Sequence, residues 1–154
     1  MDPIQQEELM EAARVLIKLS ERCLDAAQHY KRAAEHADQE WLERFFTAQS
    51  DRQQQMAAEL AARISALGAQ PPHRGTLGGE LESLALALES NLGLGDRGLL
   101  EWCRREAASE EADFSQALAS ATDPACRALL HRGLELIGAA RAELDRLHAA
   151  YHRD

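Results

Sequence analysis

Proline and glycine are confined to a few short stretches of this chain, and long intervals separate them. Proline occurs only at positions 3, 71, 72 and 124, and most glycines cluster at 68–79 and 93–98. Because both residues end or interrupt helices, the intervals predict long helical blocks. Alanine, leucine, glutamate, glutamine and arginine dominate these blocks, whereas valine occurs once. Strand formers are therefore scarce, and the sequence predicts an all-α fold.

Apolar and small residues recur every three or four positions within the blocks, which is typical of helices with one buried face. In the first block, from about Pro3 to about His36, this stripe consists of Leu9, Ala13, Leu16, Ser20, Cys23, Ala27, Tyr30 and Ala34. Further stripes cover about 38–67, 97–121 and 124–152. The last three blocks begin beside predicted N-caps, because an Asp side chain accepts bonds from the first helical turn; these are Asp38, Asp96 and Asp123.

The blocks pair into two helical hairpins, 3–67 and 96–152, joined by a crossover over 68–95. This crossover is long enough to run the length of the bundle, and a short apolar helix is expected within it at about 80–92. The second and third long helices would then be parallel, as in a ferritin-like four-helix bundle. We expect residues 1–154 to form a single helical-bundle domain, with an up-down-up-down bundle as the alternative.

The composition also excludes classes of partner. A formal net charge of −9 argues against nucleic acid and anionic membranes, since both require a cationic surface. No run reaches the roughly 18 apolar residues of a membrane span. The acidic N-terminus does not resemble a signal peptide, and the cysteines Cys23, Cys103 and Cys126 form no CxxC motif. A cytoplasmic location with free thiols is expected.

The histidines do not fit a di-iron centre. Such bundles place a Glu-x-x-His pair on each of two helices, and none of the histidines here stands three residues after a glutamate. Asp145-x-x-His148 comes nearest, but it lies close to the end of the fourth helix. His148 and His152, four residues apart, form an alternative zinc or nickel pair. The prediction is a bundle without a metal or other cofactor.

Polar residues occupy or flank the middle of the apolar stripes. They define a candidate polar cluster at the bundle centre: Asp25, Glu35, Gln49, Arg52, Gln53, Glu106, Glu110, Glu135 and Arg141. Buried carboxylates need partners, and an arginine could neutralise them where a metal ion is missing. The alternative is that these residues lie at stripe edges and are solvated.

Four short motifs resemble those of a known family: Tyr30-Lys-Arg-Ala-Ala-Glu35, Leu67-Gly-Ala-Gln-Pro71, Gly75-Thr-Leu-Gly-Gly79 and Cys103-Arg-Arg-Glu106. In this order they resemble a bacterial family of ferritin-like four-helix bundles catalogued as a domain of unknown function. The resemblance implies the fold but no reaction. The chain departs from the family's pattern at Ala27 and Gln28, where a carboxylate is common, and at Arg141, near a common histidine. Both departures remove candidate metal ligands.

These observations predict a non-catalytic, metal-free bundle with a structural or protein-interaction role, linked to stress, that forms a homo-oligomer or binds a protein partner. A partner surface could use Met10, Trp41, Phe45, Met56 and Trp102. The alternative function is a divergent metal-binding or redox protein that holds iron or manganese on Asp25, Glu35, Glu106, Glu110 and Glu135. Thiol chemistry at Cys103 is a third alternative, because the adjacent arginines would lower the pKa of an exposed thiol.

Overall fold

The computed structural model describes residues 2–76 and 95–151. Within these ranges the chain forms four long helices and no strand, which confirms the predicted all-α class; the helices are α1 (Pro3–His36), α2 (Glu40–Ala66), α4 (Gly95–Ser120) and α5 (Pro124–Tyr151). Their bounds agree with the predicted ones to within about one helical turn. The short helix predicted at about 80–92 lies outside the described residues.

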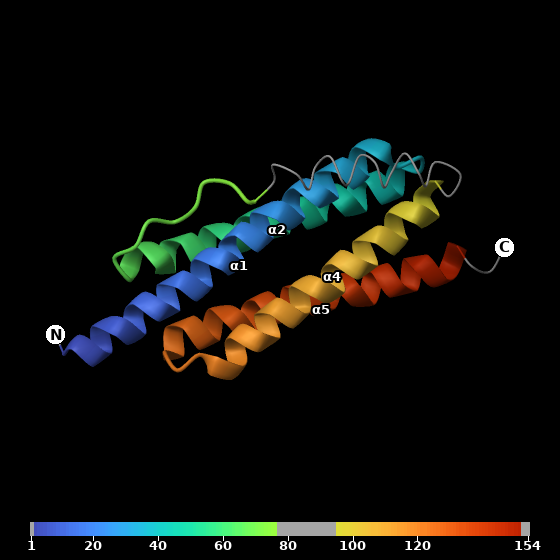
Figure 1. Cartoon of the computed structure of the whole chain (residues 1–154). Coiled ribbons are helices and arrows are strands. Elements are labelled where there is room, and N and C mark those ends of the chain that lie inside the picture. Colours follow the sequence, from blue (N-terminus) through green and yellow to red (C-terminus); the bar gives the residue numbers. More distant parts are fainter. Residues whose placement is uncertain (1, 77–94, 152–154) are drawn as a thin grey trace.

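The helices form two antiparallel hairpins, α1–α2 and α4–α5, which pack against each other (Figure 1). α1 contacts α4, and α2 contacts α5. α2 and α4 run in the same direction (Figure 1), as the length of the crossover predicted. Within the part of the chain that the structure describes, no helix has the length and hydropathy needed to cross a bilayer.

Two helix starts follow the local sequence closely. The Asp2 side chain accepts a hydrogen bond from the Ile4 N–H at 3.2 Å, and Pro3 occupies the first turn of α1. At α5, the Asp123 side chain accepts a hydrogen bond from the Cys126 N–H at 3.0 Å, which confirms the predicted cap. Both carboxylates satisfy N–H groups that have no partner within the helix.

The other two predicted caps, Asp38 and Asp96, are wrong. The residue before α2 is Gln39, whose side chain makes no capping bond. Instead, Asp96 of α4 accepts hydrogen bonds from the backbone N–H groups of Asp38 at 2.7 Å and Gln39 at 3.1 Å. The Tyr151 hydroxyl donates to the same carboxylate at 3.2 Å. Asp96 therefore binds the backbone just before α2 and ties the two hairpins together, and its negative charge is favourable near the N-terminus of that helix.

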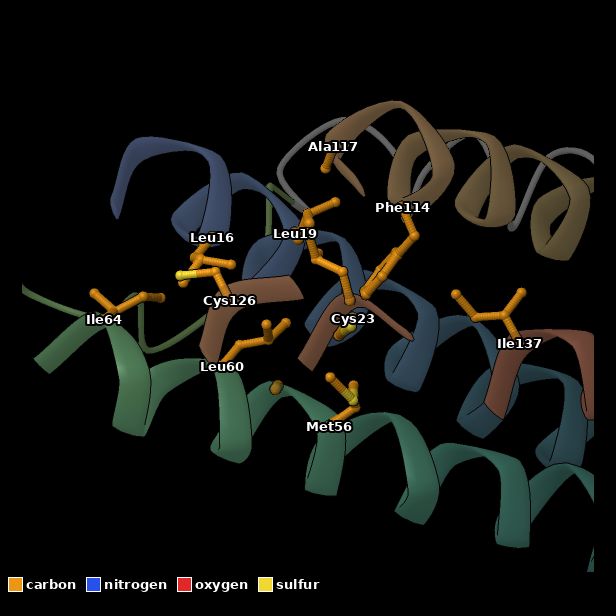
Figure 2. Packing of buried hydrophobic residues seen from close by; sticks show 12 residues of the cluster. Leu16, Leu19, Cys23, Met56, Leu60, Ile64, Phe114, Ala117, Cys126 and Ile137 are labelled. Atoms are coloured by element: carbon orange, nitrogen blue, oxygen red, sulfur yellow. The ribbon is translucent and has the colours of Figure 1, made fainter. Parts of the chain in front are cut away.

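Two apolar clusters fill the bundle. Figure 2 shows the first, to which all four helices contribute; it includes Leu16, Cys23, Met56, Leu60, Phe114 and Ile137. The second cluster includes Tyr30, Leu42, Phe46, Leu100 and Leu144. Gly133 allows the Phe114 ring to approach α5, because a Cβ atom at this position would lie 2.3 Å from the ring. Between the clusters along the helices lie buried polar residues.

Candidate functional site

The centre of the bundle contains a carboxyl–amide pair, Glu110 of α4 and Gln53 of α2. Both side chains are buried, and only 2% of Glu110 is exposed. The Gln53 Nε2 group donates a hydrogen bond to Glu110 Oε1 at 2.7 Å. The other two oxygens of the pair, Glu110 Oε2 and Gln53 Oε1, are buried without a hydrogen-bond partner. The pair thus contains two acceptors that lack a donor, which is rare in protein interiors.

Burial raises the pKa of Glu110 to about 7, and the negative charge of Asp113 acts in the same direction. The Gln53 hydrogen bond, the Arg22 guanidinium and the Cys23 thiol oppose this shift. Burial, together with the adjacent Glu110, raises the pKa of the Cys23 thiol well above its ordinary value. Cys23 is therefore a protonated thiol. It is not an activated nucleophile, because a reactive cysteine needs a lowered pKa.

An ion-pair network lies beside the central pair, between α1 and α4. Arg22 contacts the Glu106 carboxylate at 3.5 Å and the Asp113 carboxylate at 3.4 Å, and it donates a hydrogen bond to the Glu106 backbone oxygen at 3.3 Å. His29 Nδ1 lies 3.7 Å from Glu106 Oε2. A cavity of about 10 Å³, lined in part by these residues and Glu110, has room for about one water molecule.

Sequence reasoning missed Arg22 and His29. They lie about two helical turns apart on α1, so they share the helix face beside the apolar stripe. That spacing was the one signal that could have indicated them, but many solvated surface pairs have the same spacing.

Asp25, a member of the predicted central cluster, binds a loop instead. Its carboxylate is buried and accepts hydrogen bonds from the Thr76 N–H at 2.9 Å and the Thr76 hydroxyl at 2.7 Å. Gly75 permits this approach, because a Cβ atom there would lie 1.9 Å from Asp25 Oδ1 and 2.9 Å from the Glu21 backbone oxygen. Asp25 thereby fastens the chain that leaves α2 onto α1.

The remaining members of the predicted cluster are spread over the bundle. Glu35, Arg52 and Glu135 are exposed, and Glu35 pairs with Arg32 at 3.2 Å. Arg141 pairs with Glu111 at 2.9 Å on the α4–α5 surface. Gln49 is buried on α2. Of the nine residues, the structure brings together Gln53 and Glu110, with Glu106 beside them.

The residues predicted as an alternative metal pair and as a reactive thiol are His148, His152 and Cys103, and none of them belongs to the central pair. His148 lies 2.9 Å from Arg104 through Nδ1 and 2.7 Å from Glu101 through Nε2, whereas His152 lies outside the described residues. Among residues 2–76 and 95–151, no three His, Cys, Asp or Glu side chains form a group that could hold a metal ion. Cys103 is buried, and burial raises the pKa of its thiol, so the adjacent arginines do not activate it.

A family comparison covers most of this architecture. The model of a family described as a domain of unknown function, DUF2383, matches residues 11–120. The chain belongs to the DUF2383 family. The match extends from α1 through α4, so it includes both members of the Gln53–Glu110 pair, while α5 lies beyond it. Comparison with curated proteins and with solved structures returned no match.

The DUF2383 bundle also has a groove of about 580 Å³ between the N-terminal part of α1 and the turn that joins α4 to α5. Apolar side chains contribute much of its wall: Leu9, Ala12, Val15, Leu16, Ala117, Ala121 and Leu130. Glu8, Glu11 and Asp123 add carboxylates. This groove, defined here as the α1 groove, combines apolar surface with negative charge.

The five residues predicted as a partner surface in this DUF2383 chain do not form one patch. Met56 lies in the apolar core, and Trp102 packs edge-on against His29. Trp41, 46% exposed, stacks on Tyr151 at the start of α2, whereas Met10, 54% exposed, lies near the start of α1. These two helix starts are at opposite ends of the bundle (Figure 1).

Proposed function

We propose that this DUF2383 chain is a non-catalytic helical bundle that binds a partner protein in the α1 groove. The observation that carries this proposal is the apolar wall of the groove, part of which is formed by the first, largely exposed turns of α1. Ala13 is the first buried residue of α1, and the preceding turns expose Ile4 at 66% and Met10 at 54%. Met10 lines a neighbouring pocket with Leu9 and Ala13, and a groove with an apolar wall is typical of binding sites.

The proposed occupant is an amphipathic helix with basic residues beside its apolar face. The apolar wall of the groove would contact apolar side chains at helical spacing. The Glu8 carboxylate would attract lysine and arginine, and the net charge of −9 favours a cationic partner over a second copy. A homo-oligomer through this groove would place like charges together.

The architecture, the central donor set and the cysteines support three further parts of this proposal. We propose that the bundle is ferritin-like, because α2 and α4 run in the same direction. One carboxylate, one amide and one thiol meet at the centre, namely Glu110, Gln53 and Cys23. This set favours a metal-free bundle over the iron or manganese alternative. The three cysteines are free thiols, which supports a cytoplasmic location.

The test uses two labelled helical peptides with the same leucine face, one flanked by lysines and the other by glutamates. Fluorescence anisotropy should detect binding of the basic peptide only, and this binding should weaken as salt rises. Ala12→Glu, which places a charge in the groove, and Glu8→Lys should each weaken binding at least tenfold. The matched controls are Trp41→Glu and Glu35→Lys, both on exposed positions outside the groove, and neither should change affinity.

Two results would overturn the proposal. One is equal affinity of the wild type and Ala12→Glu for the basic peptide. The other is a dimer, seen by light scattering, that Ala12→Glu dissociates; it would assign the groove to a second copy of the chain.

A further inference from the structure

The Gln53–Glu110 pair has an unbalanced set of hydrogen-bonding groups. An ionised carboxylate only accepts hydrogen bonds, whereas the glutamine amide has two donor hydrogens and one acceptor oxygen. Gln53 Nε2 satisfies Glu110 Oε1 at 2.7 Å, which leaves Glu110 Oε2 and Gln53 Oε1 without donors. Both oxygens belong to the same bonded pair of groups, and both are buried. A single added hydrogen would satisfy both.

We infer that the Gln53–Glu110 pair is a binding site for one proton, held on Glu110 Oε2 and donated to Gln53 Oε1. The protonated acid and the amide then form a ring with two hydrogen bonds, one in each direction. Both buried acceptors gain a donor, and no net charge remains on Glu110. This inference goes beyond the proposed partner binding and does not depend on it.

The groups around Glu110 do not supply an alternative neutralising charge. From α1, Arg22, the weakly donating Cys23 thiol and the Tyr30 phenol interact with it; from α4, Asp113 does. Arg22 is already in contact with Asp113 and Glu106, so its positive charge is shared with two other carboxylates. α2 contributes the neutral Gln53, and no charged group of the described part of α5 acts on Glu110. Burial raises the pKa of Glu110 to about 7, in agreement with this geometry.

The site makes the stability of the bundle depend on pH. Because the pKa of Glu110 is higher in the folded chain than its ordinary value of 4.5, the folded state retains the proton longer than the unfolded state. The stabilisation from the proton is complete below pH 4.5. It is lost as the pH rises from there through about 7. Near neutral pH the bundle would therefore gain or lose this proton with small changes in pH.

The test compares urea unfolding of the wild type, Glu110→Gln and Glu35→Gln from pH 5 to pH 9. A glutamine at position 110 supplies a permanent donor to Gln53 Oε1, so Glu110→Gln should remove the pH dependence of the site. The unfolding equilibrium constant of the wild type should rise, relative to that of Glu110→Gln, on the order of 100-fold across this range. Glu35→Gln, an exposed control, should follow the wild type. Parallel profiles of the wild type and Glu110→Gln would overturn the inference.

A second measurement covers the case in which Glu110→Gln does not fold. Infrared spectroscopy of the wild type at pH 6 should show the carbonyl band of a protonated carboxylic acid, whose absence would overturn the inference. Manganese or iron(II) should not raise the melting temperature of the wild type. A rise that Glu110→Gln or Gln53→Leu abolishes would assign the pair to a metal ion instead.

Discussion

Asp25 and Glu110 are both buried carboxylates, with 2% of each exposed, yet their surroundings differ. Asp25 accepts two hydrogen bonds from Thr76, one from the backbone and one from the hydroxyl. Glu110 accepts one, from Gln53, and its second oxygen has no partner. Asp25 contacts a loop, where backbone N–H groups are available. Glu110 is enclosed by helices, whose interior N–H groups are already bonded along the chain.

This comparison indicates how each carboxylate is accommodated in the bundle. A loop can stabilise an ionised carboxylate by supplying N–H and O–H donors. A helix–helix core offers only side chains, so a carboxyl group there retains a proton unless a cation or several donors meet it. The same chain thus contains one buried carboxyl group that a loop supplies with two donors and another, at the bundle centre, that Gln53 supplies with one.

The largest expected effect comes from Asp25→Ala. It leaves the Thr76 N–H without its acceptor and removes two hydrogen bonds to a charged group, so the free energy of unfolding should fall by about 3 kcal/mol. Urea denaturation at pH 7 measures the change. Thr76→Val, which keeps the N–H bond, should lower it by about 1 kcal/mol. A cost no larger than that of the exposed Glu35→Ala would contradict the role assigned to Asp25.

Gly75→Ala should have the next largest effect, about 2 kcal/mol, because its Cβ atom would collide with Asp25 and with the Glu21 backbone oxygen. Gly138→Ala is the matched control. Nothing lies within 4 Å of a Cβ atom there, so it should stabilise α5 by about 0.5 kcal/mol. In the Asp25→Ala background the cost of Gly75→Ala should fall, as measured by a double-mutant cycle. Additive costs would show that the loop does not depend on Asp25.

Gln53→Leu tests Glu110, the second carboxyl group of the comparison, and its expected effect on the free energy of unfolding is smaller. It removes the hydrogen bond to Glu110 Oε1, so the ionised carboxylate loses a donor and the pKa of Glu110 should rise further. The free energy of unfolding should fall by about 1 kcal/mol more at pH 8 than at pH 5. The comparison of unfolding midpoints at these two pH values measures it. An equal loss at both would indicate a packing defect alone.

The helices could be predicted because their causes are local. Proline at positions 3 and 124, the glycine clusters and the repeat of apolar residues determine where the helices begin and end. The contacts between helices were harder to predict from the sequence. Asp96 has the sequence position of a cap for its own helix, but it binds the backbone of Asp38 and Gln39 just before α2, because the start of α4 lies beside the start of α2.

The candidate site was predictable only in part. Gln53 and Glu110 were indicated by their positions in the apolar stripes, which require partners for any polar residue. Their pairing could not be predicted, because it depends on how α2 and α4 are rotated about their own axes in the bundle. Glu106 and Glu110 are one helical turn apart, yet the first lies beside Arg22 at the edge and the second lies in the core. A periodic pattern does not resolve that difference. Asp25 was misleading because its partner, Thr76, belongs to a loop.

A carbon-13 NMR titration of the glutamate side-chain carboxyl groups tests the central claim most directly. Glu110→Gln assigns the signal by its disappearance. The account predicts that the Glu110 carboxyl carbon titrates with a midpoint of about 7, because burial raises the pKa of this group and its proton is retained to near neutral pH. A midpoint below about 5, in the range of ordinary glutamates, would show that Glu110 is ionised in the folded bundle and would contradict the account.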